Sequence, residues 1–407
     1  MTLDAAAGRS LVQQLQLSGL DANLLRRMTQ GPDNLRTPLK PTRETALRDD
    51  PLAVAVRLFF CGSTVDASQG SVWPLPEGIV VSIGQGQVEA PFHLRIVRGL
   101  FLFSDYLNGP PDAVMGAGQT TAILYQAAKP SRPAAHSIDR VLDLGCGAGT
   151  LALLLARDAN HAVGVDISER AVTLARFNAA VNDVQNVEFR QGDLFAPVAG
   201  ETFDLIVSQP PYYPVGVGFG EGESHGYLHG GPRGDEIAQQ ILDQLPAQLA
   251  PGGRGIIFTS WPDDRAAPSS KPFRILELHA DRREVYGARQ SLTVIEHAVG
   301  KGWKATREVP GDCWGDVHAW RIDQILAAEE LLSGPDTELL RFHFAMPQGA
   351  QWLEEAGVRF LRCPPEALVA LTPVDARLAE VIHAVQHGGY LEPTALRTCL
   401  ERGLLVV

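Results

Sequence analysis

Residues 141–150 read Val141-Leu-Asp-Leu-Gly-Cys-Gly-Ala-Gly-Thr150, an apolar run that ends in alternating glycines. The chain continues with Leu151-Ala-Leu-Leu-Leu-Ala-Arg157, which has the composition of a helix. The stretch predicts a strand, a tight turn and a helix that presents unpaired N–H groups at its start. Because glycines also let a ligand approach the bare main chain, we expect a nucleotide-like ligand at this turn.

A second strand with an acidic end follows. The run Ala162-Val-Gly-Val165 is apolar and leads into Asp166. A carboxylate at this position, about twenty residues after the glycine turn, can accept hydrogen bonds from both hydroxyls of a ribose. The dinucleotide pattern G-x-G-x-x-G, however, needs a glycine where the chain has Thr150. The spacing G-x-G-x-G after Asp143 is a poor cradle for a pyrophosphate.

This glycine pattern, D-L-G-C-G-x-G, resembles motif I of the class I S-adenosylmethionine (SAM) methyltransferases. Further motifs follow in the family's order. Asp166 matches the acidic ribose ligand, Gly192-Asp193-Leu194-Phe195 matches the turn beside the adenine, and Phe203–Ser208 matches the fourth strand. A lone glycine loop is a weak signal, whereas an ordered series of motifs is a strong one.

The next motif is Gln209-Pro-Pro-Tyr212, which resembles the (D/N/S)-P-P-Y signature of enzymes that methylate nitrogen on a planar amide or amine. Glutamine-N5 and adenine-N6 methyltransferases belong to this group. The resemblance implies that the side chain at 209 and the carbonyl of Pro210 hold the acceptor's N–H groups, while Tyr212 packs on its plane. Gln209 is one methylene longer than asparagine, which implies a displaced or different acceptor.

The loop from Pro214 to Asp235 is glycine-rich and ends in Gly230-Gly-Pro-Arg-Gly-Asp235. This end resembles the G-G-x-D-G segment that follows the N-P-P-Y motif in glutamine-N5 methyltransferases. We predict that the loop is a substrate lid, since long loops without secondary structure are usually functional.

The resemblance implies SAM as the cofactor and Gln209, Pro210 and Tyr212 as catalytic residues. The implied cofactor-binding residues are Thr120, Asp143, Gly145, Cys146, Gly147, Gly149, Asp166, Ile167, Asp193, Leu194 and Gln209. Thr120 lies in Met115–Thr121, which resembles the loop before motif I in isoaspartyl methyltransferases; a helix cap is equally compatible. No metal site is predicted, because the five cysteines show no C-x-x-C spacing.

The 407 residues exceed one usual domain of roughly 100–200 residues. We predict an α/β fold, because strands and helices alternate from residue 138 to about 300. The expected domain at 105–310 has a Rossmann-like, seven-stranded and mostly parallel sheet, with ligands beyond the carboxyl ends of the strands. Residues 1–104 should form a winged-helix-like cap. Residues 311–407 should form a small helical or winged module, with helices at 322–332, 352–356, 376–385 and 394–400.

The net charge of −12 argues against a chain that tracks a phosphate backbone. A small-molecule or protein acceptor is therefore favoured over nucleic acid. No run of about eighteen apolar residues predicts a membrane span, and the N-terminus lacks the regions of a signal peptide. The expectation is a cytoplasmic enzyme without a membrane partner. The oligomeric state stays open, with a homodimer among the alternatives.

The function predicted from these motifs is SAM-dependent methyl transfer to a nitrogen of a planar amide or amine, in a protein glutamine, a nucleobase or a small molecule. An alternative is O- or C-methylation that tailors a natural product. Oxygen acceptors need a base, which His225 or His229 could supply. A third alternative is a SAM-fold scaffold that binds a partner and has lost transfer activity.

Overall fold

The structure is a computed structural model. It describes residues 3–30, 38–71, 79–106, 111–129, 138–217, 227–262, 273–284, 287–297, 302–309, 314, 317–332, 344, 350–355, 358–362, 371–374, 376–387, 391–401 and 405. The chain divides into two compact units. Unit 1 contains residues 1–122 and 137–250, and unit 2 contains residues 123–136 and 251–407.

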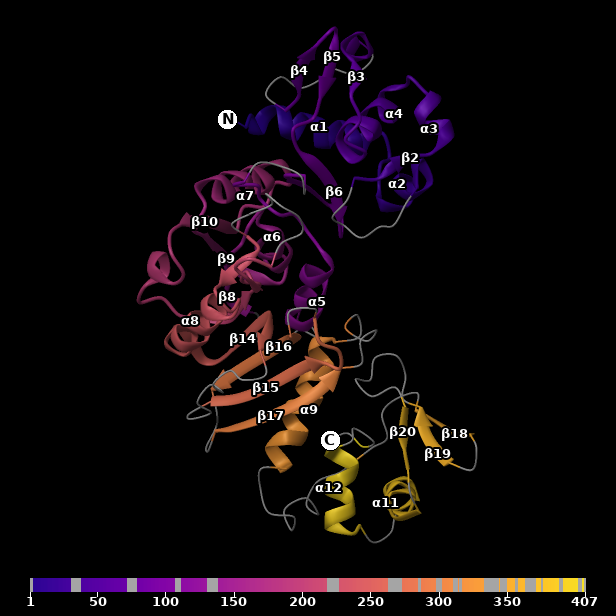
Figure 1. Cartoon of the computed structure of the whole chain (residues 1–407), viewed down its shortest axis with the longest axis vertical. Helices are drawn as coiled ribbons and strands as arrows, with labels where there is room; N and C mark the ends of the chain where they lie inside the picture. Colours follow the sequence, from indigo (N-terminus) through magenta and orange to yellow (C-terminus); the bar gives the residue numbers. More distant parts are fainter. Residues whose placement is uncertain are drawn as a thin grey trace. The chain divides into compact units, whose positions relative to one another are not determined.

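Unit 1 is organised around four parallel strands: β8 (Ile138–Leu144), β9 (Ala159–Asp166), β10 (Val187–Gln191) and β11 (Phe203–Ser208). The helices α6 (Thr150–Leu155) and α7 (Glu169–Val181) pack on them (Figure 1). Strand register aligns the carboxyl ends, because Leu144 pairs with both Val165 and Ser208, and Asp166 pairs with Gln191. The segments that follow these strands therefore meet at one edge.

The other elements of unit 1 are mostly short. They are α1 (Ala5–Leu17), α2 (Ala22–Met28), β1 (Thr29–Gln30), β2 (Lys40–Pro41), α3 (Arg43–Leu47), α4 (Pro51–Ala55), η1 (Val56–Phe60), β3 (Val65–Asp66), η2 (Ala67–Ser71), β4 (Val81–Gly84), β5 (Gln87–Glu89), β6 (His93–Val97), β7 (Leu100–Ser104), η3 (Ala196–Val198), β12 (Tyr213–Pro214), β13 (His229–Gly231), α8 (Glu236–Gln244) and η4 (Leu245–Gln248). Helix α5 spans Gln119–Ala128.

Helix α7 holds the N-terminal elements through two asparagines. The Asn178 amide accepts from Phe103 N at 2.9 Å and donates to the carbonyls of Phe103 and Ala148. One helical turn later, the Asn182 amide exchanges the same pair of bonds with Phe101. These side chains pair with β7 as another strand would. They satisfy backbone groups that would otherwise be buried without a partner.

Helix α1 packs on the same helix. A Cβ added to Gly8 would lie 2.6 Å from atoms of Phe177 and Val181, so only a glycine permits the approach. Leu15 of α1, Phe59 of η1, Leu94 of β6 and Phe177 of α7 belong to a single apolar cluster. The N-terminal segment therefore shares its core with the helix that follows Asp166.

Unit 2 is built on β14 (Leu249–Pro262), β15 (Phe273–Ala280), β16 (Ala288–His297) and β17 (Trp303–Val309). Strand β16 pairs antiparallel with β14 and β15, and β17 pairs parallel with β15. The helix α9 (Ala319–Leu332) lies against this sheet (Figure 1), with Glu330 bonded to Trp303 Nε1 and Asp323 to Arg254.

The full sheet has eight strands in the order β10-β9-β8-β11-β14-β16-β15-β17. The α/β class and the mostly parallel sheet are confirmed. The strand count differs from the predicted seven. Strand β17 alternates exposed and half-buried residues before Val309, so no continuous apolar run marks it as a strand.

The last part of unit 2 contains β18 (Gln351–Glu355), β19 (Val358–Arg362), β20 (Leu371–Pro373), α11 (Ala376–His387) and α12 (Pro393–Glu401). The helices predicted near 322–332, 376–385 and 394–400 are present. The helix predicted at 352–356 is wrong, because residues 351–355 form a strand in which Trp352 pairs with Leu361. In the described part of the chain, every helix is too short or too polar to cross a bilayer.

Candidate functional site

A cavity of about 550 Å³ lies in unit 1, where the four parallel strands end. Its walls contain most residues that the sequence motifs single out: Asp143, Gly145, Cys146, Gly147, Asp166, Ile167, Asp193, Leu194, Gln209, Pro210 and Tyr212. Thr120 and Gly149 are not in the walls. Segments up to 69 positions apart in sequence therefore meet around one space, as expected for the carboxyl edge of a parallel sheet.

The glycine turn after β8 presents its main chain to this cavity. The N–H groups of Gly145 and Cys146 both donate to the Val165 carbonyl, at 2.8 and 3.0 Å. Gly145 has φ +76°, and a Cβ built on it would meet nothing within 4 Å. Glycine is needed here for its backbone conformation, and the space in front of it is open to a ligand.

Asp166 is tied to the same turn. Its Oδ2 accepts from Gly147 N at 2.8 Å, and its Oδ1 accepts from Ser168 N at 2.9 Å. Burial raises the pKa of this carboxyl, and the backbone N–H groups oppose that rise. A carboxylate offers about four acceptor positions, so acceptor capacity remains for a ligand that enters the cavity.

Asp143 lies at the end of β8 and is 2% exposed. Its Oδ2 accepts from Ala152 N, at the start of α6, at 2.9 Å. Burial raises the pKa of Asp143 to about 7, and the charge of Asp166 adds to the rise. Burial also raises the pKa of the neighbouring Cys146 thiol well above its usual value, so this thiol is neutral.

The turn after β10 carries Asp193 and Leu194 into the cavity walls. Gly192 N donates to the Asp166 carbonyl at 3.0 Å, which joins this turn to the end of β9. Leu194 has φ +44°, a left-handed conformation that is rare for leucine. Such a conformation persists only where the surrounding structure imposes it.

The Gln209–Tyr212 turn forms another wall. Ser208, which precedes it, is fully buried and donates from Oγ to the Leu144 carbonyl at 2.8 Å. That bond fixes the end of β11 to the end of β8. Tyr212 is 7% exposed and stacks on Tyr213, with ring centroids 5.1 Å apart. The start of the turn is thus fixed to the sheet, and the turn places the rings of Tyr212 and Tyr213 in the cavity wall.

The segment Gly230–Asp235 packs directly on this turn. A Cβ added to Gly230 would collide with the carbonyl oxygens of Gly234 and Pro211. A Cβ on Gly234 would lie 2.6 Å from the Tyr212 carbonyl oxygen. The two motifs are therefore in backbone contact, a relation that the sequence pattern alone does not state.

Several wall residues were not predicted as site residues: Thr121, Tyr213, Tyr227, Leu228, Ile237, Gln240 and Ile241. Thr121 does lie in the Met115–Thr121 motif, and Tyr227 and Leu228 lie in the loop predicted as a lid. Ile237 and Ile241 stand one turn apart on α8, so helical periodicity was a usable signal for them. Thr121 Oγ1 accepts from Gly118 N at 3.1 Å, whereas Thr120 is buried beside it. His229 lies outside the walls, with Nδ1 3.2 Å from the Pro214 carbonyl oxygen, and His225 lies outside the described residues.

The wall that precedes α5 is held by an ion pair. Arg170 binds Asp105 with both ends of its fork, through Nε at 2.9 Å and Nη2 at 2.6 Å. Asp105 Oδ2 also accepts from Val114 N at 2.7 Å, next to Met115 in the cavity wall. Because Asp105 is 7% exposed, the bidentate pair fixes the position of this segment.

The charge of the cavity has one sign. Among the described wall residues, the charged side chains are the aspartates 112, 143, 166 and 193, and there is no Lys, Arg, His or Glu. Such walls favour a cation and disfavour an anion, because charges interact strongly where water is excluded. Within the described part of the chain, no group of three metal-binding side chains occurs.

Comparison with known proteins agrees with this geometry. Residues 135–303 match a family model described as a methyltransferase domain. A release factor glutamine methyltransferase of Aliivibrio fischeri is 41% identical over 109 residues, which cover 26% of this chain and 37% of that protein. A putative protein N5-glutamine methyltransferase of Methanocaldococcus jannaschii is 39% identical over 118 residues, or 28% of this chain and 57% of that protein.

A solved structure is also similar. The 16S rRNA N2 G1207 methyltransferase of T. thermophilus, in complex with AdoMet and guanosine, is 19% identical with a TM-score of 0.33. The match covers 58% of this chain and 65% of that one. The chain spans about half the length of the curated relatives that it matches.

Proposed function

We propose that this chain, whose class I methyltransferase domain is similar to the glutamine-N5 group, is an enzyme that transfers the methyl group of SAM to a nitrogen of a planar amide. The observation that carries the proposal is the shared cavity. The glycine turn, Asp166 and the Gln209–Tyr212 turn all line it, and its charged walls are carboxylates alone among the described residues.

The residues present fit SAM. The cofactor carries a sulfonium and an ammonium group, which suit the described walls, where aspartates occur and no cationic side chain does. The open space at Gly145 gives room for the nucleoside. Asp166 would receive the ribose hydroxyls at its unused acceptor positions, and Asp193 and Leu194 would hold the adenine.

When bound, SAM supplies a methyl group already activated by a positively charged sulfur. The chain's main contribution is therefore positioning. The Gln209 amide oxygen and the Pro210 carbonyl would accept hydrogen bonds from the acceptor's N–H groups, aim its nitrogen at the methyl group and stabilise the positive charge that develops there. The rings of Tyr212 and Tyr213 would pack on the planar group.

The acceptor that we propose is a glutamine side chain of a protein, the type of substrate named for the relatives. A glutamine amide is neutral and planar, and it suits walls made of tyrosines, aliphatic side chains and Gln209. An acceptor with a phosphate near the methylated atom would face aspartates, and the described wall residues offer it no compensating cation. The oxygen-acceptor alternative has less support, because His229 lies outside these walls.

We further propose that residues 105–310 form the catalytic domain of a cytoplasmic enzyme, with residues 1–104 and 311–407 as flanking modules that influence the choice of acceptor. The family model matches residues 135–303, all of which lie inside the proposed catalytic domain, and it includes no residue of either flank.

Two measurements test the proposed function. Calorimetry should show SAM binding to the wild-type chain and a large loss in Asp166→Ala, which removes the acceptors for the ribose. Mass spectrometry should then find the label of methyl-labelled SAM on a glutamine nitrogen of an acceptor protein. A methyl group on oxygen or carbon would contradict the proposed acceptor, and absence of SAM binding would favour the scaffold alternative.

A further inference from the structure

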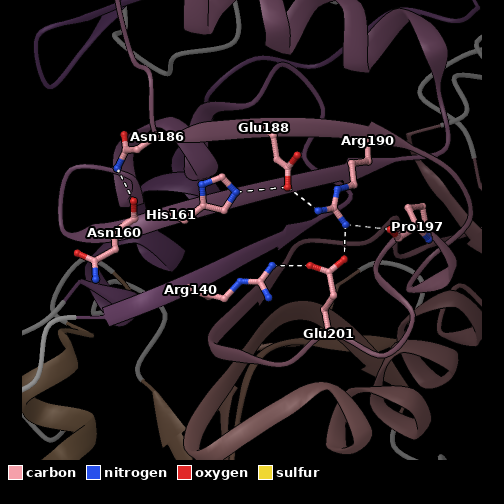
Figure 2. A network of polar contacts seen from close by, with 8 residues as sticks. All are labelled: Arg140, Asn160, His161, Asn186, Glu188, Arg190, Pro197 and Glu201. Carbon is pink, nitrogen blue, oxygen red and sulfur yellow. Dashed lines mark hydrogen bonds and ion pairs between the residues drawn. The ribbon is translucent and has the colours of Figure 1, made fainter.

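The guanidinium group of Arg190 links the two ends of the segment that contains Asp193 and Leu194. Arg190 is the penultimate residue of β10, directly before this turn. Its Nη1 donates to the Pro197 carbonyl at 3.0 Å and also binds Glu201, which lies just before β11. Its Nη2 binds Glu188 on its own strand (Figure 2). The fork thereby connects the two ends of the segment 191–201.

The turn between these ends is held in a conformation that it would not adopt alone. Leu194 has φ +44°, a left-handed backbone conformation that strains a residue with a side chain. Gly192 is packed so closely against the Pro197 ring that a Cβ would collide with it. Pro197 therefore contacts the start of the turn through its ring, while Arg190 fixes Pro197 through its carbonyl. If Pro197 moved, Gly192 at the start of the turn would lose the ring that it packs against.

We propose that Arg190 is a positioning residue for the adenosine half of the cofactor: by fixing the Pro197 carbonyl it holds Asp193 and Leu194 in the shape that receives the adenine. The inference rests on the proposed function, since it takes this turn as the adenine site. Arg190 does not line the cavity, so its effect on a ligand is indirect.

Arg140 provides a matched control. It belongs to the same network and binds the other oxygen of Glu201 (Figure 2). Its guanidinium also lies over the Phe203 ring, 4.8 Å from the ring centroid. Its side chain is 31% exposed, against 28% for Arg190. Arg190 differs from Arg140 in two contacts: it also binds Glu188, and it alone is joined to the Pro197 carbonyl in Figure 2. If these arginines only stabilise the fold, their variants should lower the unfolding midpoint and leave the binding constants of the folded protein unchanged.

The experiment compares Arg190→Met, Arg190→Lys and Arg140→Met with the wild-type chain. Calorimetry gives the dissociation constants of SAM and of adenosine, and thermal unfolding gives the stability of each variant. We expect Arg190→Met to raise the dissociation constants of SAM and of adenosine by the same factor of about ten, because only the adenosine half of SAM would contact the turn. Arg140→Met should change either dissociation constant by less than about twofold, because it removes a partly exposed ion pair and no contact with Pro197.

Arg190→Lys keeps the charge but lacks the fork, so it should fall between the wild type and Arg190→Met. This variant also covers the case in which Arg190→Met fails to fold. Equal losses in the Arg190 and Arg140 variants, or unchanged constants in folded Arg190 variants, would overturn the positioning role while SAM binding by the wild type stands. A wild-type chain that binds neither SAM nor adenosine would overturn the proposed function and this inference together.

Discussion

Asp143→Asn should remove a pH dependence from the stability of this protein. The pKa of Asp143 is raised by burial to about 7, against 3.8 for the exposed group, a difference of about 3 units. Between these values the folded chain holds a proton that the unfolded chain releases. Stability therefore falls as the pH rises through this window and levels off above pH 7, with a total loss of about 4 kcal/mol at 1.36 kcal/mol per unit.

The assay is urea unfolding of the wild type and of Asp143→Asn at pH 5 and pH 8. Asparagine keeps the shape and the acceptor for Ala152 N without a titratable group. We expect the wild type to lose about 3 kcal/mol more than the variant between these pH values, since about two units of the window lie above pH 5. Asp139→Asn, exposed on the same strand, serves as the control. Parallel pH profiles for wild type and Asp143→Asn would refute the reasoning.

Three further outcomes are expected. Gly145→Ala should lower the free energy of unfolding in urea by about 1–2 kcal/mol, because its φ of +76° disfavours a side chain. It should also weaken SAM binding in calorimetry, because the added Cβ would enter the open space. Asn178→Ala should destabilise by about 2–4 kcal/mol, since it leaves buried backbone groups of β7 and of Ala148 in the glycine turn unpaired. Unfolding midpoints should show a smaller loss for Asn182→Ala, because Asn182 is half-buried. SAM binding at pH 7 should release a proton, because a bound cation lowers the pKa of Asp143. Calorimetry in two buffers of different ionisation enthalpy should therefore give different binding heats, and identical heats would count against this release.

The parts of the site that the sequence predicted are those governed by local rules. Gly145 and Gly147 have positive φ, so their backbone conformation is encoded in the residue type itself. Asp166 follows an apolar strand, and parallel strands bring their carboxyl ends together whatever their neighbours are. Such features can be inferred without knowing which distant segments pack against them.

The parts that were missed depend on contacts between distant segments. Trp352 lies in a five-residue run too short to tell a helix from a strand, and only pairing with Leu361 decides its conformation. Asn178 looks like an ordinary polar residue within a helix until β7 is placed beside it. The contact between Gly230 and the Pro211 carbonyl likewise joins two motifs whose separation in sequence gives no indication of proximity.

That contact limits how the acceptor preference of this protein could be changed. At positions 230 and 234 any side chain would push on a carbonyl of the Gln209–Tyr212 turn, so substitutions there would shift the groups proposed to hold the acceptor nitrogen. Tyr227, Leu228 and Gln240 line the cavity outside those two positions. A variant library aimed at new acceptors should vary these three residues and keep both glycines. If positions 230 and 234 are also mutated at random, the active variants should still have glycine at both.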